Sequence, residues 1–185
     1  MSGPIGADHP RVDAEDKLRG RTSYTIDIDA GQMLHVALLR SEVAAGRLVS
    51  LDLEPARLMP GVRAVISAPD APGLYGVMVA DHPLFVIDEI RYMGEPIAAV
   101  AAETLEQAQA AAAAIQVEIE ERVPLITMAQ ALEFGANEIH PQWRGYELLA
   151  GEGARDGNIS WESTVVRGDV DEAFARDDVT VVETL

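Results

Sequence analysis

The stretch Asp88-Glu-Ile-Arg-Tyr-Met-Gly-Glu-Pro-Ile-Ala-Ala-Val-Ala-Ala-Glu103 decides the fold of this chain. A Gly-Glu-Pro turn introduces the apolar run 96–102, which predicts a buried strand. Thr104 and Gln107 then stand three residues apart, the capping-box spacing at the start of an α-helix. Apolar residues of that helix repeat at spacings of three or four on one side: Leu105, Ala108, Ala112 and Ile115. Because this side is mostly alanine, we expect the helix to lie close against its sheet.

Shorter elements are predicted around this unit. Besides 96–102, the expected strands are 33–39, 47–53, 62–66 and 117–119. The nearly continuous apolar run 33–39 predicts a strand that is covered on both faces. In 47–53 the alternation places Val49, Leu51 and Leu53 on one face and Leu48 on the other. Pro55 is expected to begin a short helix that ends at 59–61.

Other segments have weaker patterns. Residues 1–22 are polar and interrupted by glycine and proline, which indicates an extended arm, and 67–88 is expected to be a loop with at most one short strand near 75–79. Thr127 and Gln130 repeat the capping-box spacing and predict a helix to about residue 133. Glycines and charges then indicate a connecting segment at 134–157. The elements expected beyond it are a strand at 159–167, a helix at 169–176 and a strand at 179–183.

The composition excludes several classes of function. The chain has 185 residues and a net charge of −17, from 31 acidic and 14 basic side chains. This charge repels phosphate backbones, so we expect no nucleic-acid partner. The acidity is typical of a solvated surface; the alternative is an acidic patch that docks onto a basic partner. Cysteine is absent from the sequence, which removes disulfides, thiolate metal sites and cysteine nucleophiles.

Nothing in the sequence predicts a membrane or an export signal. No apolar run approaches the roughly 18 to 20 residues that span a bilayer. The first ten residues have no apolar core of the kind found in secretory signals. We therefore expect a cytoplasmic protein.

Five sequence blocks occur in an order typical of one family. They are 11–20 with Tyr24 and Asp27, 33–41, 59–65, 91–96, and 157–158 with 168–169 and 173–174. Together they resemble the molybdopterin-binding large subunit of the xanthine dehydrogenase and aldehyde oxidase enzymes, at its N-terminal α/β hammerhead domain. The structural motif residues of these blocks are Arg40, Ser41, Pro60, Gly61, Tyr92, Gly94, Glu95 and Pro96. One departure is 42–46, where the family commonly has proline and histidines.

The resemblance implies an α+β fold with a mixed β-sheet packed by a few helices. It implies an N-terminal arm at 1–19, the hammerhead domain at 20–133, a linker at 134–157, and the truncated start of the molybdopterin-binding domain at 158–185. The strand expected at 179–183 would lack its partners, so we expect it to fray, to pair with the domain's own sheet, or to exchange between two copies of the chain.

The resemblance also implies a function for the complete enzyme. Such enzymes oxidise a purine, an aldehyde or an N-heterocycle with oxygen from water at a molybdenum–molybdopterin centre. Electrons then pass through [2Fe–2S] clusters to FAD, which other domains or subunits carry. The residues that bind these cofactors lie outside this chain in the family, so we expect a non-catalytic scaffold. Its partners would be the remainder of the molybdopterin subunit and the iron–sulfur and FAD subunits.

Candidate reactive residues each have a structural alternative. His35 lies in an apolar strand and is expected to be a core or interface histidine. Asp81 and His82, near Asp88 and Glu89, would form an acid–base or metal cluster or, alternatively, a turn cap. Glu95 beside a proline can bond backbone amides, which favours structure over catalysis. Trp143 and Trp161 would anchor the connecting segment or pack against the remainder of the subunit.

Two rival functions remain. One is a free-standing module that binds a small ligand or a partner protein in a cleft around 68–95. The other is a small acid–base enzyme that uses Asp81, His82 and Glu95.

Overall fold

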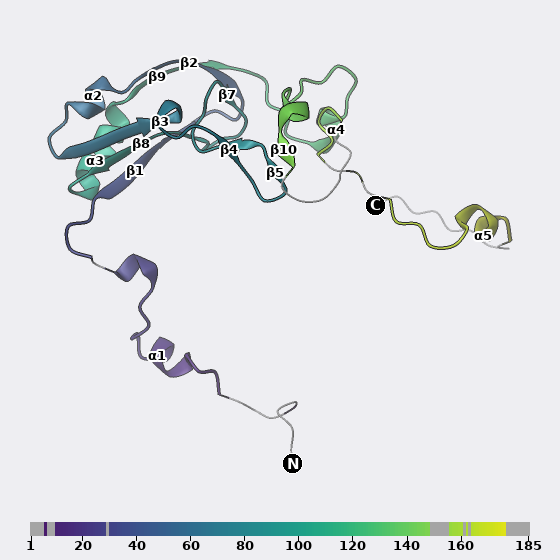
Figure 1. Ribbon diagram of the computed structural model, residues 1–185, viewed down its shortest axis with the longest axis horizontal. Helices are drawn as coiled ribbons and strands as arrows, with labels where there is room; N and C mark the ends of the chain where they lie inside the picture. The colour runs from purple at the N-terminus through teal and green to yellow at the C-terminus, as the bar shows by residue number, and fades with distance from the viewer. Residues whose placement is uncertain are drawn as a thin grey trace.

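The computed structural model describes residues 6, 10–28, 30–148, 156–160, 162 and 164–176. Its larger sheet is centred on β8 (Pro96–Ala102), with β1 (His35–Arg40) on one side and β3 (Val62–Ser67) on the other (Figure 1). Both ladders are antiparallel. The predicted strands at 33–39, 62–66 and 96–102 are therefore confirmed.

Helix α3 (Leu105–Ala114) packs against this sheet, as its alanine side predicts. The Thr104 hydroxyl accepts the N–H of Gln107 at 3.2 Å, and the Gln107 carboxamide accepts the N–H of Thr104 at 3.1 Å, which confirms the capping box. The buried helix residues Ala108, Ala111 and Ala112 let the helix approach β1 and β8 closely. Leu105, expected on the buried side, is 44% exposed. It lies at the first turn, outside the area that the sheet covers.

Besides a cluster of Val86, Ile90 and Ile97, the described residues form a main hydrophobic cluster between α3 and one face of the larger sheet. Val65, Ala98 and Val100 point into it from the strands, and Ile115 joins them from the end of α3. The short helix α2 (Glu54–Arg57) adds Ala56, and Pro55 lies in its first turn. The opposite face of β1 is exposed, so our prediction that this strand is covered on both faces is wrong for the chain described here: α3 provides only one covering layer.

A second sheet contains β7 (Glu89–Ile90), β2 (Gly46–Asp52) and β9 (Gln116–Glu121), again with antiparallel ladders. Leu48 pairs with Ile119 and Ser50 with Glu118, so Val49 is the extra residue of a β-bulge. Leu48 and Leu51 consequently both pack inward, and Val49 is 44% exposed. The strict alternation that we predicted for 47–53 is wrong, because the bulge reverses the faces at this point.

The segment 67–88 has more structure than predicted. It contains the 3-10 helix η2 (Ala68–Asp70) and three two-residue strands: β4 (Leu74–Tyr75), β5 (Val79–Ala80) and β6 (His82–Pro83). Strand β4 pairs with β6, and β5 pairs with β10 (Glu147–Leu148). Because β10 lies at the end of the segment 134–148, its pairing with β5 connects that segment to the segment 67–88. Strands this short carry too little periodicity to be predicted.

The remaining elements are short. They are α1 (Ala14–Leu18), η1 (Thr25–Asp27), α4 (Met128–Ala131), η3 (Trp143–Gly145) and α5 (Val170–Arg176). Figure 1 shows α1 and α5 apart from the two sheets. The caps that we predicted at Thr127 and Asp169 are both present. The described residues of 159–167 form only an isolated bridge at Ile159, not the predicted strand, and 179–183 lies outside the described residues.

The α+β fold class is confirmed, with a few helices packed on sheets. Where we expected one mixed sheet, the described strands form separate sheets whose ladders are all antiparallel. Among the described residues, no helix is long and apolar enough to cross a membrane.

Candidate functional site

The turn that introduces β8 is fixed by the side chain of Glu95. This side chain is only 1% exposed, and its Oε2 accepts the backbone N–H of Arg91 at 2.7 Å. Gly94 has a φ of +87°, a conformation that favours glycine, and this lets the chain turn back before Pro96 begins the strand. The sequence correctly predicted that the Glu95 carboxylate bonds a backbone amide.

The same turn is tied to the end of β1. The Arg40 guanidinium donates to the carbonyl of Gly94 at 2.8 Å, the N–H of Ser41 donates to the carbonyl of Glu95 at 2.9 Å, and the N–H of Gly94 donates to the carbonyl of Ser41 at 2.8 Å. Six of the eight motif residues therefore meet here: Arg40, Ser41, Tyr92, Gly94, Glu95 and Pro96. Pro60 and Gly61 lie elsewhere, beside the start of α3, where the Gly61 carbonyl accepts the N–H of Glu103.

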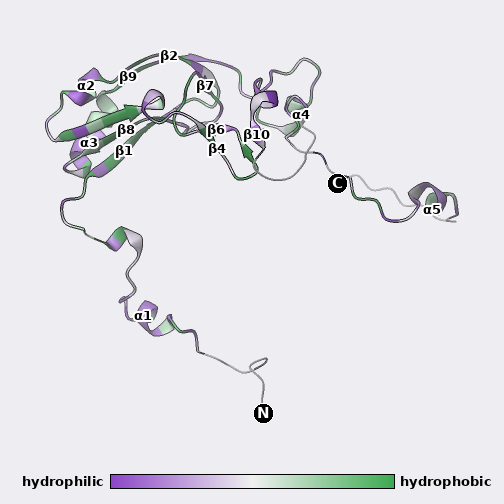
Figure 2. Cartoon of the chain, viewed as in Figure 1, coloured by the Kyte–Doolittle hydropathy of each residue, from purple (hydrophilic) through white to green (hydrophobic). Residues whose placement is uncertain are grey.

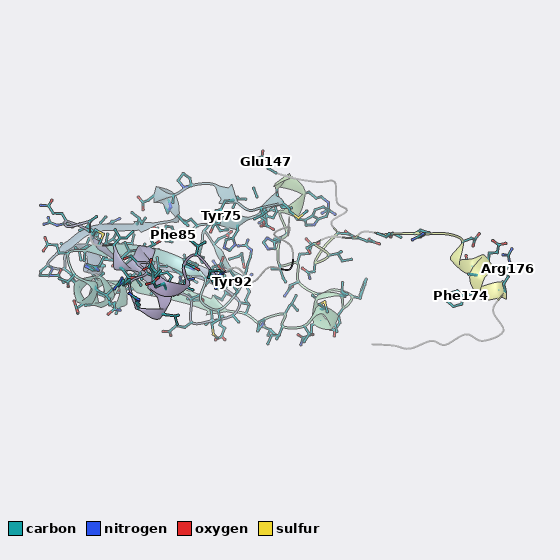
Figure 3. The ribbon with its side chains drawn as sticks, turned by 90° about the horizontal axis from the view of Figure 1, so that it is seen from below. Tyr75, Phe85, Tyr92, Glu147, Phe174 and Arg176 are labelled. Carbon is teal, nitrogen blue, oxygen red and sulfur yellow. The ribbon has the colours of Figure 1, made fainter. Side chains whose placement is uncertain are left out.

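An aromatic cluster adjoins this turn. The Tyr92 hydroxyl lies 3.2 Å from His82 Nε2, and the His82 ring contacts Tyr75 edge-on at a centroid distance of 5.3 Å. Burial raises the pKa of the Tyr92 phenol, and the negative charge of Glu95 raises this pKa further. Figure 3 shows Tyr75 and Tyr92 on the body of the protein, far from Phe174 and Arg176 on α5. His82 is thus half-buried between two tyrosines, and the turn-cap role proposed for Asp81 stays a prediction.

A groove of about 690 Å³ lies next to this turn. Residues from four segments line it: 44–46, 89–93, 122–126 and 137–141. Both of its arginines are engaged within the chain. Arg122 forms an ion pair with the Glu89 carboxylate at 2.7 Å, and Arg91 donates to the Glu89 carbonyl at 3.2 Å. The groove overlaps only the end of the cleft that the sequence suggested at 68–95.

The side chains of Arg91 and Asn158 clamp the backbone of Ile139, a residue that lines this groove, by hydrogen bonds. Arg91 Nε donates to the Ile139 carbonyl at 3.2 Å, and the Ile139 N–H donates to Asn158 Oδ1 at 2.8 Å. Asn158 Nδ2 also donates to the carbonyls of Ala131 and Asn137, at 3.0 and 2.9 Å. Sequence reasoning placed Asn158 in a family block but missed this clamp, since its partners lie 19 to 27 residues away.

The other candidate residues are dispersed. His35 is exposed on β1 and is therefore not a core histidine of this chain, which leaves the interface alternative. His140 lies against Tyr146 with ring centroids 5.7 Å apart, and the Arg144 guanidinium lies 4.1 Å from the centre of the Trp143 ring. No three His, Asp or Glu side chains among the described residues are grouped to hold a metal. Trp161 lies outside those residues.

These features define an antiparallel α+β domain built around a structural turn rather than around a cluster of reactive groups. A model of the family described as "Aldehyde oxidase and xanthine dehydrogenase, a/b hammerhead domain" matches residues 19–123. The chain belongs to this family, as its sequence blocks indicated.

Known relatives agree with this assignment. The chain is 35% identical to the nicotinate dehydrogenase large molybdopterin subunit of Eubacterium barkeri, over 97% of the chain and 40% of that protein. It is 36% identical to a probable xanthine dehydrogenase subunit of Bacillus subtilis (strain 168), over 94% of the chain and 22% of that protein. Quinoline 2-oxidoreductase from Pseudomonas putida 86 superposes with a TM-score of 0.66 at 33% identity, over 74% of the chain and 19% of that structure. The chain thus spans less than half the length of these relatives.

Proposed function

We propose that the chain is the N-terminal, non-catalytic portion of the large subunit of a molybdenum-dependent hydroxylase. The observation that carries this proposal is the alignment with a large molybdopterin subunit over 97% of the chain but only 40% of that relative. In the complete enzyme, the reaction would be the oxidation of a purine, an aldehyde or an N-heterocycle with oxygen from water. Two of the relatives are named for substrates that contain a ring nitrogen, nicotinate and quinoline, and another is an aldehyde oxidoreductase.

The residues described here do not fit a molybdenum–molybdopterin site. The arginines of the groove are bonded to Glu89 and Ile139. The buried carboxylate of Glu95 accepts a backbone amide of its own turn with Oε2, and its Oε1, buried without a partner, offers a negative charge rather than a donor to an anionic cofactor. We therefore assign no chemical step to this chain. Its proposed role is to support the rest of the large subunit and to contact the iron–sulfur and FAD subunits, in the cytoplasm.

A hybrid enzyme tests this proposal. In the Eubacterium barkeri protein, the portion that aligns with this chain is replaced by the chain itself, and the hybrid is expressed with the other subunits of that enzyme. We expect the hybrid to contain molybdenum and to oxidise nicotinate, and the isolated chain to contain none. Stoichiometric molybdenum in the isolated chain, or a hybrid that never acquires the metal, would contradict the proposal.

The groove supports a second candidate, a free-standing module that binds a small ligand. Part of its wall is apolar, as in most small-molecule sites, and its volume of about 690 Å³ lies within the range of such sites. A library of small heteroaromatic acids, screened against the isolated chain, tests this candidate. A compound that raises the melting temperature of the chain, but not that of a variant with the half-buried groove residue Ala44 replaced by a larger side chain, would favour it.

A further inference from the structure

The outer face of the larger sheet is apolar over two consecutive rows of the strand register, which end at Arg40. Val36 pairs with Ala101, and Ala101 pairs on its other side with Ala64. Leu38 pairs with Ala99, which pairs on its other side with Ile66. Residues paired directly across a ladder share a face of the sheet. The outer face therefore presents two rows of three side chains: Val36, Ala101 and Ala64, then Leu38, Ala99 and Ile66.

This face lies opposite the cluster under α3, and of its six positions only Ala99, at 7% exposure, is buried. The core side chains of the same strands, such as Val65 and Val100, alternate with it and point towards α3. On the outer face, Val36 is 59% exposed, Leu38 40% and Ile66 37%. An antiparallel sheet with one solvated face normally carries polar residues on that face. Here the six positions carry none, so the sequence is suited to a second covering layer.

The shape of the face also indicates packing. The central strand contributes only alanine, while the two outer strands contribute the larger Val36, Leu38 and Ile66. A row of apolar side chains on another element could therefore pack against the small residues of β8, between the larger ones on either side. Figure 2 shows much of β3 and β8 in the green of apolar residues.

We propose that this outer face is the surface on which the remainder of the molybdopterin subunit packs. The inference rests on the proposed function, which makes the chain one part of a larger subunit. The relatives provide the partner: this chain covers 40% and 22% of their length, so most of such a subunit lies outside it. A second copy of the chain is disfavoured, because each copy has a net charge of −17 and the two would repel each other.

The charges beside the face specify the chemistry of that partner. Arg63, the polar residue next to Ala64 on β3, forms an ion pair with Glu103. Arg40, at the end of β1, donates to the carbonyl of Gly94. These cations are engaged within the chain, so the face itself offers apolar contact. Its partner is therefore an apolar surface of the subunit rather than a charged peptide.

A matched pair of substitutions tests the inference. Leu38→Glu places a carboxylate on the outer face, and Leu58→Glu makes the same change at a leucine that is 81% exposed next to α2. In the isolated chain, we expect both variants to melt within about 3 °C of the unaltered protein, because neither leucine is in the core. In the hybrid enzyme, Leu38→Glu should lower the yield of molybdenum-containing protein about tenfold or more, because an unpaired carboxylate would be buried. Leu58→Glu should leave this yield unchanged.

A milder variant covers the case in which Leu38→Glu prevents folding. Val36→Thr keeps the β-branched shape of a residue that is 59% exposed, so the isolated chain should fold normally. In the hybrid, it should lower the yield about two- to fivefold, since the threonine hydroxyl would be buried without a partner.

The possible outcomes separate the two proposals. An unaltered hybrid that never acquires molybdenum counts against the proposed function itself. A working hybrid in which Val36→Thr and Leu38→Glu behave like Leu58→Glu leaves the proposed function standing and overturns the assignment of the face. An isolated chain that is dimeric, and that Leu38→Glu makes monomeric, would show that a second copy covers the face and would also overturn it.

Discussion

Replacing Gly61 by alanine should destabilise the chain through two separable effects. Gly61 has a φ of +80°, and an alanine in that conformation costs about 1 to 2 kcal/mol. The added Cβ would also overlap the carboxamide of Gln107. That carboxamide accepts the N–H of Thr104 in the capping box of α3. Losing this one hydrogen bond costs about 0.5 to 1.5 kcal/mol, so the free energy of unfolding should fall by about 1.5 to 3.5 kcal/mol in total.

Urea unfolding followed by circular dichroism measures this loss, because the free energy of unfolding varies linearly with urea concentration. Gly94→Ala is the matched control. Gly94 has a similar φ of +87° but open space where the Cβ would lie, so it should show only the cost of the backbone conformation. A double-mutant cycle isolates the second effect. In a Gln107→Ala background the overlap is gone, and Gly61→Ala should cost about 1 kcal/mol less than in the unaltered chain. Equal costs in both backgrounds would refute the role given to Gln107.

Three further predictions concern the site and the second sheet. Glu95→Ala removes the acceptor of a buried backbone amide, so the free energy of unfolding should fall by about 1 to 3 kcal/mol, whereas Glu95→Gln, which keeps an acceptor oxygen, should lose less; equal losses would argue against the hydrogen bond. Asn158→Ala should speed hydrogen exchange of the Ile139 amide about tenfold without changing exchange in β8, and unchanged exchange at Ile139 would rule out the clamp. Leu48→Thr should lower the free energy of unfolding by about 1 kcal/mol or more and Val49→Thr by less than about 0.5 kcal/mol, because the bulge turns Val49 outward. The reverse order in urea unfolding would support strict alternation instead.

Local patterns in the sequence predicted much of the fold. The capping boxes at Thr104 and Thr127 depend on residues three positions apart, and both are present. The buried strand 96–102 follows from its continuous apolar composition. The bond from Glu95 to a backbone amide follows from the geometry of a carboxylate beside a proline. Each of these features is determined by neighbours within a few residues, which a single sequence displays.

Features that depend on distant pairing could not be predicted in this way. The bulge at Val49 exists because β2 pairs with β9, about 70 residues later in the chain. The clamp on Ile139 requires both Arg91 and Asn158, which are far apart in sequence. The aromatic contacts of His82 arise when β6 pairs with β4 and the turn at Tyr92 closes over them. None of these partners leaves a signal in the local pattern of residue types.

The prediction for β1 failed in a way that is itself informative. Its nearly continuous apolar run predicts cover on both faces, but in this chain only the face towards α3 is covered. If the apolar run of β1 had no structural meaning, the neighbouring positions of the sheet on the exposed face would have no common composition. Instead, the directly paired positions of β8 and β3 on that face are apolar too, although β3 carries the polar Arg63 immediately beside them. Three strands from different parts of the chain thus agree on one apolar surface. Such agreement is expected if the sequence is suited to the complete subunit, in which another layer covers this face, rather than to the isolated domain.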